Sequence, residues 1–492
     1  MTKIIQQAAA ETLRQPKALY LLVLVQMWEC FSFYGMRVLL VLYMVNQLQF
    51  SDLRAIAIYA VYTGLVELTG VIGGLVADRL IGLRRAIALG GWLIAAGHIC
   101  MALEGASNGF FFGLALIVVG SSLFSTNVSA LLGLYYKQED VRREAGYTWF
   151  YIGINIGGLL ASILCGFVGE QFGWHYGFGL AAIGMIIGNI LLLLFDSVLE
   201  DKGLPPVYMK ITSYQLFPIM IILAICVVSG GLIYADLVIP LLPLVSLVCM
   251  GFVGYRLWES RTVTLSTLMT LILYLAALAL FFAAEEQMGS SLMLFSERHV
   301  TREWFGIEVP SSVLMSVNPM TVILLGSCLT RLCGNLWGKS GTSGAFPYRI
   351  VIAFVLSALA FGGLAITCAL NNAEGKEQMS VAILAGAFVL ISLGEIIIGP
   401  AVYSFCSEVA SEKTQGTVMG LVPIGFSLAS FIGGYISTVL AVPEGSSYQP
   451  LEVYSSGFTL IAGLLIGFAV IFAVGIPVSQ TYLNRQNKKV IA

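Results

Sequence analysis

The stretch Gln26-Met27-Trp28-Glu29-Cys30-Phe31-Ser32-Phe33-Tyr34-Gly35-Met36-Arg37 lies inside a long apolar run over residues 18–45. That run is too long for a signal-peptide core and has no small-residue cleavage site, so we expect it to remain as a transmembrane helix. One face of this helix carries Glu29, Phe33 and Arg37, which follow at intervals of four. A charge at the bilayer centre costs about 2.5–3.5 kcal/mol, so this face must line protein or a water-filled cavity. A structural ion pair between two helices is the alternative.

The composition of the whole chain is that of a protein with many membrane spans. Of its 492 residues, 58% are hydrophobic and only 11% are charged, whereas soluble proteins carry about 25% charged residues. The net charge of −2 gives no sign of nucleic-acid binding. The nine cysteines stand singly and the three histidines are scattered. We therefore expect no disulfide framework, no metal site and no cofactor.

Runs of about 20 apolar residues predict fourteen transmembrane helices. Their expected ranges are 17–46, 54–79, 84–104, 108–136, 143–168, 175–197, 213–231, 236–256, 264–291, 314–337, 346–370, 379–407, 414–441 and 453–479. Six of these helices precede an extra pair of helices, and six follow it. The predicted organisation is an N-terminal segment (1–16), a six-helix bundle (17–197), a linker with two extra helices (198–262), a second six-helix bundle (263–480) and a tail (481–492).

Two further patterns agree with this organisation. With the N-terminus inside, 20 of the 25 basic residues fall on the cytoplasmic side, which predicts that both termini are cytoplasmic. A short echo also relates the two halves, since Leu160-Ala161-Ser162-Ile163 recurs as Leu428-Ala429-Ser430-Phe431. Paired six-helix halves with a site near the midplane are a recurring plan among transporters.

The loop after the second helix reads Gly73-Gly74-Leu75-Val76-Ala77-Asp78-Arg79-Leu80-Ile81-Gly82-Leu83-Arg84-Arg85. Glycines allow tight turns, and an acid at a helix end can cap it or pair with a base. The loop resembles the signature loop of the major facilitator superfamily. An ordinary basic cytoplasmic loop is the alternative. The resemblance implies a loop that takes part in conformational change through Gly74, Asp78, Arg79, Gly82 and Arg84.

Several motifs in order resemble the proton-coupled oligopeptide transporter family across nearly the whole chain. They are Phe150-Tyr151-Ile152-Gly153-Ile154-Asn155, Glu285-Glu286-Gln287-Met288-Gly289-Ser290-Ser291-Leu292, Asn318-Pro319 and Glu395-Ile396-Ile397-Ile398-Gly399-Pro400. The resemblance implies the major facilitator fold, with two six-helix bundles plus two extra helices. It also implies a transporter, not an enzyme, that uses a proton gradient to carry small peptides.

The departures from this family concern the charged positions. The family pattern Glu-x-x-Glu-Arg in the first helix is Gln26, Glu29 and Cys30 here. The family's fourth-helix lysine is Ser125, while Glu67 stands where a tyrosine is common. The chain therefore resembles an atypical member.

These departures leave an excess of acids. The expected cavity holds Arg37 against five carboxyls, those of Glu29, Glu67, Glu285, Glu286 and Glu395. Five acids facing one base cannot all be ionised in a dry site. Some carboxyls are then protonated, which suits a proton site, or a cationic substrate completes the charge balance. We expect a substrate that carries extra positive charge or lacks a free carboxylate.

The resemblance also suggests roles for individual residues. Arg37 and Glu286 are similar to a family pair that bridges the two bundles on the outer side, as a gate or as a static bridge. Glu29 is a candidate proton site, and Glu395 is a candidate ligand for a substrate ammonium or a helix-break residue. Amide groups of two asparagines suit a peptide backbone or helix packing, and aromatic residues line pocket walls or only pack. The expected substrate-binding residues are Phe33, Tyr34, Glu67, Ser125, Asn155, Phe282, Glu285, Asn318 and Glu395, and the coupling residues are Glu29, Arg37, Glu286 and Glu395.

Three interpretations remain open from the sequence. The first is a proton-coupled symporter of di- and tripeptides, working as a monomer in a plasma membrane such as the bacterial inner membrane. The second is a carrier of a cationic non-peptide metabolite, and the third is a transport-deficient sensor that binds substrate. There is no Gly-x-x-x-x-Gly-Lys phosphate loop and no nucleophile–base set in the membrane segments, which excludes an ATP-driven pump within this chain and argues against an enzyme.

Overall fold

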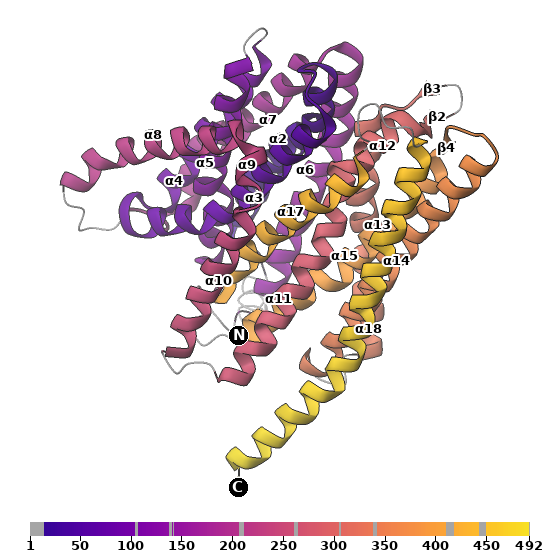
Figure 1. The fold of residues 1–492 in the computed structure, drawn as a ribbon. Helices are drawn as coiled ribbons and strands as arrows, with labels where there is room; N and C mark the ends of the chain where they lie inside the picture. Colours follow the sequence, from indigo (N-terminus) through magenta and orange to yellow (C-terminus); the bar gives the residue numbers. More distant parts are fainter. Residues whose placement is uncertain are drawn as a thin grey trace, which may run out of the picture. The chain divides into compact units, whose positions relative to one another are not determined.

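The computed structural model describes residues 14–103, 107–136, 140, 142–205, 211–259, 264–304, 307–337, 342–409, 418–441 and 449–491. Helices dominate all of these ranges (Figure 1). The first part of the chain contains α2 (Lys17–Asn46), α3 (Asp52–Val76), η1 (Ala77–Ile81), α4 (Leu83–Ala102), α5 (Ser107–Gly133), α6 (Arg142–Phe172), α7 (Trp174–Leu194), η2 (Asp196–Leu199), α8 (Ile211–Ile233), α9 (Ala235–Val238) and α10 (Leu242–Glu259).

The second part begins with a helix that is interrupted and ends with the longest one. Its helices are α11 (Leu265–Glu285), η3 (Glu286–Gly289), α12 (Ser291–His299), η4 (Ser311–Ser316), α13 (Val317–Trp337), α14 (Thr342–Ala373), α15 (Val381–Val409), α17 (Leu421–Leu440) and α18 (Pro450–Ile491). Four short strands pair two by two. Strand β1 (Val300–Thr301) runs parallel to β4 (Met379–Ser380), and β2 (Glu303–Trp304) runs antiparallel to β3 (Ile307–Glu308).

The helix lengths suit a membrane. In the described part of the chain, fourteen helices have 18 residues or more. Twelve spans are apolar enough to cross a bilayer, and two shorter apolar helices lie at Phe217–Ile233 and Ser311–Gly326. About 20 residues at a rise of 1.5 Å cover the 30 Å hydrocarbon layer. The predicted all-helical membrane fold with fourteen helices is confirmed.

Several of the expected helices differ from a single regular span, and the expected helix 236–256, for example, is divided into α9 and α10. The second expected helix, 54–79, is α helical to Val76 and continues as a π-helical turn to Ile81. The expected helix 264–291 is interrupted by η3, and Ser290 leaves the helical region with φ −123° and ψ −96°. The apolar pattern alone did not reveal these breaks because it predicts the extent of a span and not the hydrogen-bond pattern of the backbone within it.

The chain divides into two compact units that do not follow the sequence order strictly. Unit 1 comprises the residues up to Leu39 together with Thr69–Gly230, and unit 2 comprises Leu40–Leu68 together with Gly231–Ala492. The end of α2, from Leu40 to Asn46, and the first two thirds of α3, to Leu68, therefore belong to the same unit as α11 to α18. The inserted helices α8 and α10 are divided in the same way, since α8 lies almost wholly in unit 1 and α10 in unit 2.

Close backbone contact holds helices together within unit 1. A Cβ atom added to Gly97 in α4 would lie 2.6 Å from the carbonyl oxygen of Gly113 in α5, and one added to Gly113 would lie 2.8 Å from that of Gly97. Lipid tails are as apolar as the side chains they meet, so helices in a membrane associate through tight packing of small residues. Glycine is thus required where these two helices cross.

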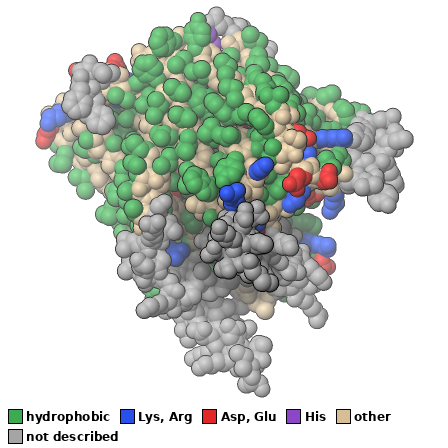
Figure 2. Space-filling view, turned by 180° about the vertical axis from the view of Figure 1, so that it is seen from behind, with side chains coloured by type: hydrophobic (Ala, Val, Ile, Leu, Met, Phe, Trp, Pro, Cys, Tyr) green, Lys and Arg blue, Asp and Glu red, His purple; other side chains and the backbone are tan. Residues whose placement is uncertain are grey.

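Aromatic side chains fill the corresponding contacts in unit 2. Helices α14 and α18 lie side by side over much of their length (Figure 1). The rings of Phe354 and Phe472 stack with centroids 5.8 Å apart, and those of Phe361 and Phe458 lie 6.0 Å apart. The outward-facing side chains are also apolar, and the face in Figure 2 is covered by hydrophobic side chains with charged ones gathered toward its margins. This surface suits contact with lipid.

Candidate functional site

The Glu29 carboxyl of α2 is buried in unit 1 and is held by hydrogen bonds from three side chains. Gln26 Nε2 donates to Glu29 Oε2 at 2.7 Å, and the Cys30 thiol donates to the same oxygen at 3.5 Å. The Ser125 hydroxyl of α5 donates to Glu29 Oε1 at 3.0 Å. Glu29 is only 4% exposed. A carboxyl at the expected depth of the membrane is therefore held by three neutral groups.

The local sequence explains this arrangement. Gln26 precedes Glu29 by three residues on one helix, so the two side chains lie on one face. Ser125 is 96 residues away in the sequence, and its short side chain reaches Glu29 because α5 and α2 lie close together at this point. Sequence analysis selected Glu29 and Ser125 separately but did not predict that they would touch, and it treated Gln26 only as a lost acid. The signal that could have found Gln26 is its polar amide one turn before a buried acid.

Arg37 lies two turns further along α2 and is 9% exposed. Its guanidinium carbon lies 5.9 Å from the centroid of the Tyr34 ring, which is within the range of a cation–π contact. The rings of Phe33 and Tyr34 meet edge to face at 5.3 Å. Both rings are partly exposed. This face of α2 therefore presents a cation with aromatic neighbours, as the spacing of the residues predicts.

Asn155 of α6 is buried, and its amide donates to the carbonyl oxygen of Tyr151 at 2.9 Å. That bond runs within one turn of the same helix. It favours the packing role for Asn155, although the carbonyl oxygen of its side chain is still an acceptor that a substrate N–H can use.

In unit 2, Glu286 begins the η3 turn at the interruption between α11 and α12. The Tyr59 hydroxyl of α3 donates to Glu286 Oε2 at 3.2 Å, and the Ser430 hydroxyl of α17 donates to Oε1 at 3.4 Å. Backbones are close here, since a Cβ atom on Gly433 would lie 3.1 Å from Glu286 Cβ. Three elements of the unit thus converge on this carboxyl.

The neighbouring residue Gln287 fixes the same turn, and sequence analysis missed it. Its Nε2 donates to the carbonyl oxygens of Ala283 and Gly433, both at 2.9 Å. Its Oε1 accepts from the hydroxyls of Ser291 at 2.7 Å and Ser437 at 2.6 Å. The side chain is fully buried and all four of its hydrogen-bonding positions are used. This network ties the interruption after α11 to α17.

Glu395 of α15 and Asn318 of α13 form a second pair in unit 2. The Asn318 amide donates to Glu395 Oε2 at 2.7 Å and to the Ser392 hydroxyl oxygen at 3.0 Å. The Ser392 hydroxyl donates in turn to the carbonyl oxygen of Phe388 at 2.8 Å. Two residues that were predicted separately as substrate ligands are thus brought together, and the amide orients the carboxyl.

The other predicted residues of unit 2 are partly exposed. Phe282 packs edge to face on Phe426 with centroids 4.7 Å apart, against a cluster of α11 and α17 residues. Glu67 on α3 and Glu285 at the end of α11 both retain partial exposure. That Glu67, Glu285 and Phe282 bind substrate remains a prediction.

The expected binding residues are therefore divided between the two units. Unit 1 carries Phe33, Tyr34, Ser125, Asn155 and the coupling residues Glu29 and Arg37. Unit 2 carries Glu67, Phe282, Glu285, Asn318 and the acids Glu286 and Glu395. The predicted bridge between Arg37 and Glu286 joins residues of different units and stays a prediction.

The signature loop has a defined local structure. Asp78 and Arg79 are exposed on the π-helical turn, and Gly82 has φ +80°, a backbone conformation that favours glycine. A Cβ atom on Gly82 would also lie 2.6 Å from the backbone nitrogen of Pro205. Around Gly74, by contrast, space is open.

Arg84, which follows this loop, binds the segment after α7. Its Nη1 donates to both carboxylate oxygens of Asp196 at 3.2 Å, and its Nε donates to the carbonyl oxygen of Lys202 at 2.5 Å. A further bond joins it to the carbonyl oxygen of Glu200. Arg84 therefore anchors the beginning of the linker to the loop, which the sequence did not predict.

A polar clasp that sequence analysis also missed joins the α2–α3 turn to α12 in unit 2. The two guanidinium nitrogens of Arg298 donate to the two oxygens of Asp52 at 2.6 and 2.8 Å. The Asn46 amide donates to Glu297 Oε1 at 2.5 Å. The partners are about 250 residues apart in sequence, so only the fold reveals them.

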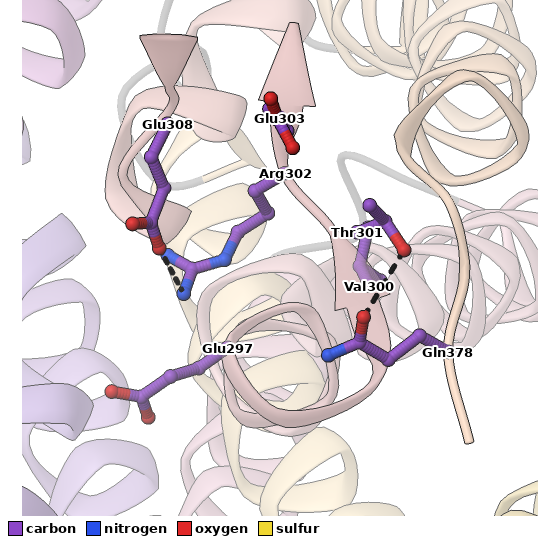
Figure 3. Close-up of a pocket in the computed structure, with 7 residues that line it drawn as sticks. All are labelled: Glu297, Val300, Thr301, Arg302, Glu303, Glu308 and Gln378. Carbon is purple, nitrogen blue, oxygen red and sulfur yellow. Dashed lines mark hydrogen bonds and ion pairs between the residues drawn. The ribbon is translucent and has the colours of Figure 1, made fainter. Parts of the chain in front are cut away.

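A shallow pocket lies beside Glu297, at the short strands of unit 2 (Figure 3). Arg302 Nη2 donates to Glu308 Oε1 at 3.3 Å there, and the Thr301 hydroxyl donates to Gln378 Oε1 at 3.1 Å. Glu303 also lines the pocket, so its lining includes three carboxyls and one guanidinium, and the guanidinium pairs with Glu308. In the described residues, no group of three or more His, Cys, Asp and Glu side chains could hold a metal ion.

Comparison with known proteins places this architecture in a family. The dipeptide and tripeptide permease A of Proteus mirabilis (strain HI4320) is 27% identical over 467 residues, covering 94% of each chain. A crystal structure of peptide transporter POT in complex with sulfate is 28% identical with a TM-score of 0.82, covering 95% of this chain and 96% of that one. A POT family transporter in complex with 5-aminolevulinic acid is 25% identical with a TM-score of 0.83, covering 94% and 97%. Residues 84–455 match the POT family, and the chain belongs to this family of multi-pass membrane transporters, not to an enzyme family.

Proposed function

We propose that this chain is a proton-coupled symporter of di- and tripeptides or related peptide-like molecules, working by alternating access. The observation that supports the proposal most is that buried or half-buried acids occur in both units, each held by oriented hydroxyl or amide groups. Glu29 serves as the proton site of unit 1, and Glu395 receives the amino group of the substrate in unit 2. Uncompensated charge is expensive within a membrane, and such residues mark ion and substrate pathways.

The gating step uses Glu286. In its ionised form, it pairs with Arg37 and keeps the outer side closed. Such a bridge in partial water contributes only about 0–1 kcal/mol, so a proton can shift the equilibrium between the closed and the open state. The Tyr59 and Ser430 hydroxyls accommodate both forms of Glu286, because a hydroxyl can donate to a carboxylate and accept from a carboxylic acid.

Specificity follows from the two positions at which family cations are replaced. Cys30 and Ser125 offer no positive charge to a substrate carboxylate, and both contact Glu29. The proposed preference is for peptides with an additional positive charge or with a blocked C-terminus. The proposed setting is a bacterial inner membrane, with a monomer whose two termini are cytoplasmic.

A second candidate function is the carriage of a cationic non-peptide metabolite. One finding bears on the non-peptide part of this function, because a POT family transporter of known structure is in complex with 5-aminolevulinic acid, a small amino acid with no peptide bond. A third candidate is a sensor that binds substrate without moving it.

Reconstitution into liposomes separates these functions. An imposed inward proton gradient should drive accumulation of a labelled dipeptide. Inhibition of this uptake by neutral, dibasic and amidated dipeptides and by simple amines then ranks these compounds by their affinity. Amines that compete better than every peptide favour the second function, and binding without uptake favours the sensor. If neutral dipeptides with free C-termini compete best, the charge argument is wrong.

A further inference from the structure

The cluster around Glu29 contains a hydrogen-bond acceptor that no described group uses. The side-chain oxygen Oε1 of Gln26 is buried and has no hydrogen-bond partner among the described residues. Gln26 as a whole is 5% exposed, and its amide nitrogen is already committed to Glu29 and Cys30. A buried acceptor without a donor is costly and is usually explained by a missing ligand, ion or water. The cluster is therefore short of one donor.

The same cluster is also short of a positive charge. The described side chains that donate hydrogen bonds to the Glu29 carboxyl, Gln26, Cys30 and Ser125, are all neutral. A buried carboxylate surrounded only by neutral groups is unfavourable unless it takes up a proton or a cation joins it. A cation with several N–H donors would supply both the hydrogen-bond donor for Gln26 Oε1 and the positive charge beside Glu29.

The size and exposure of the neighbouring side chains make such an occupant reasonable. Cys30 and Ser125 stand where an arginine and a lysine are expected from the resemblance, and both are much shorter than either cation. Ser125 is also the partly exposed member of the cluster, whereas Gln26, Glu29 and Cys30 are buried. A substrate group would enter past the Ser125 hydroxyl.

A primary ammonium carries three N–H donors and no acceptor. The cluster offers three kinds of acceptor, the Glu29 carboxylate, Gln26 Oε1 and the Ser125 hydroxyl oxygen. A proton on Glu29 would neutralise the charge but would bring one O–H donor only. The number of acceptors therefore fits an ammonium better than a proton.

We propose that Gln26, Glu29 and Ser125 form a subsite for a cationic nitrogen of the substrate, and that this nitrogen replaces the proton on Glu29. The inference rests on the proposed transport function and specifies its substrate class as peptides with a basic side chain. When the ammonium enters, the O–H bond of the Glu29 carboxylic acid breaks, the proton passes to water, and N–H···O hydrogen bonds form. The charge of the subsite stays constant, so a basic peptide supplies the positive charge that a proton on Glu29 supplies when the transported dipeptide is neutral. The titratable group in direct contact with Glu29 is the Cys30 thiol, and α5 contributes the neutral Ser125 hydroxyl.

The decisive measurement is proton release when a peptide binds. Calorimetric titration of the purified full-length protein with alanyl-lysine and alanyl-alanine, in pairs of buffers with different ionisation enthalpies, reports the protons released at each pH. We expect alanyl-lysine to release up to about one more proton than alanyl-alanine in some part of the range from about pH 5 to 8, and Glu29→Gln to abolish the difference. Equal release at every pH overturns the proposal.

A second arm does not depend on titration. Ser125→Ala should weaken binding of alanyl-lysine about tenfold more than it weakens binding of alanyl-alanine, because only alanyl-lysine loses a hydrogen bond from its charged side chain. The matched control is Ser122→Ala, which removes a hydroxyl on the same helix that donates to the carbonyl oxygen of Val119. Equal weakening of both peptides by Ser125→Ala indicates a structural role and contradicts the subsite.

Failure of the subsite and failure of the transport function give different results. Proton-driven uptake together with equal proton release refutes the subsite alone. Extra proton release on alanyl-lysine binding without any uptake refutes symport and supports the subsite. Binding of neither peptide overturns both.

Discussion

Two carboxyls of the first helix pair, Glu29 and Asp52, are held in opposite ways. Glu29 is 4% exposed and receives hydrogen bonds from neutral side chains. Asp52 is partly exposed and forms a paired salt bridge with Arg298. Asp52 thus has a cationic partner, whereas the hydrogen-bond partners of Glu29 are neutral, and in the proposed mechanism Glu29 gains and loses a proton. A carboxyl group therefore forms a structural ion pair at Asp52, whereas in the proposed mechanism the carboxyl group of Glu29 changes its charge.

The largest expected effect follows from removing the variable charge. Glu29→Gln should abolish proton-driven accumulation in liposomes, so that an accumulation ratio of about ten under a pH gradient of about one unit falls to about one. Exchange of labelled for unlabelled substrate should persist, because the fold and the gates remain. Glu374→Gln, which alters an exposed acid paired with Lys376, is the control and should accumulate normally. Undiminished accumulation by Glu29→Gln would remove Glu29 from the coupling mechanism.

A slightly smaller effect is expected at Glu395. Glu395→Gln should raise the substrate KM by about 10- to 100-fold, since a hydrogen bond to a charged amino group is lost. A peptide with an acetylated N-terminus should be affected far less. Competition of the free peptide and of the N-acetylated peptide with labelled substrate measures how far the variant changes the affinity for each. If both lose affinity equally, Glu395 supports the helix and does not bind the amino group.

Glu286 tests whether the gate senses protons. Glu286→Gln should flatten the pH dependence of uptake, because its side chain can no longer be charged. Tyr59→Phe removes one hydroxyl that donates to Glu286 but leaves its carboxyl in place, so it should change the uptake rate by about two- to tenfold while the pH dependence is preserved. Uptake measured from acid to neutral pH distinguishes the two variants. An unchanged profile for a Glu286→Gln protein that still concentrates substrate rules out the gating role.

The smallest effect is expected at the clasp. Asp52→Asn should change the uptake rate by no more than about fivefold, because a partly exposed ion pair contributes about 0–1 kcal/mol. The exchanged pair, Asp52→Arg with Arg298→Asp, should restore most of what either single change removes. A double-mutant cycle on uptake rates measures the coupling between the two residues. A loss at Asp52→Asn as large as that at Glu29→Gln would show that the contrast between the two carboxyls is false.

The sequence predicted the fold better than it predicted the contacts. Long apolar runs give the number of spans because backbone polar groups in lipid must be satisfied within helices. The spacing of Glu29 and Arg37 likewise placed both on one face of α2. The interruption at Ser290 was not visible, because the network that holds it involves α17, nearly 150 residues away.

Contacts between neutral groups were the hardest to predict. Gln287 and Asn318 have no charge to match, so nothing in the sequence pairs them with Ser437 or Glu395. For Gln26, the one signal is its position a turn before Glu29. Resemblance to a family identified Glu29 and Glu395 through motifs, but the family pattern predicts cations at the positions of Cys30 and Ser125. Only the folded chain shows Ser125 donating to Glu29.

Proton coupling itself is tested most directly by the condition at which net substrate flux is zero. Liposomes that contain the full-length protein are loaded with a fixed ratio of labelled dipeptide across the membrane, and the proton gradient is then varied. We predict that the flux reverses its direction when the proton gradient balances the dipeptide gradient, and that the balance point moves with the dipeptide ratio. Flux that always follows the dipeptide gradient, whatever the proton gradient, would contradict the account.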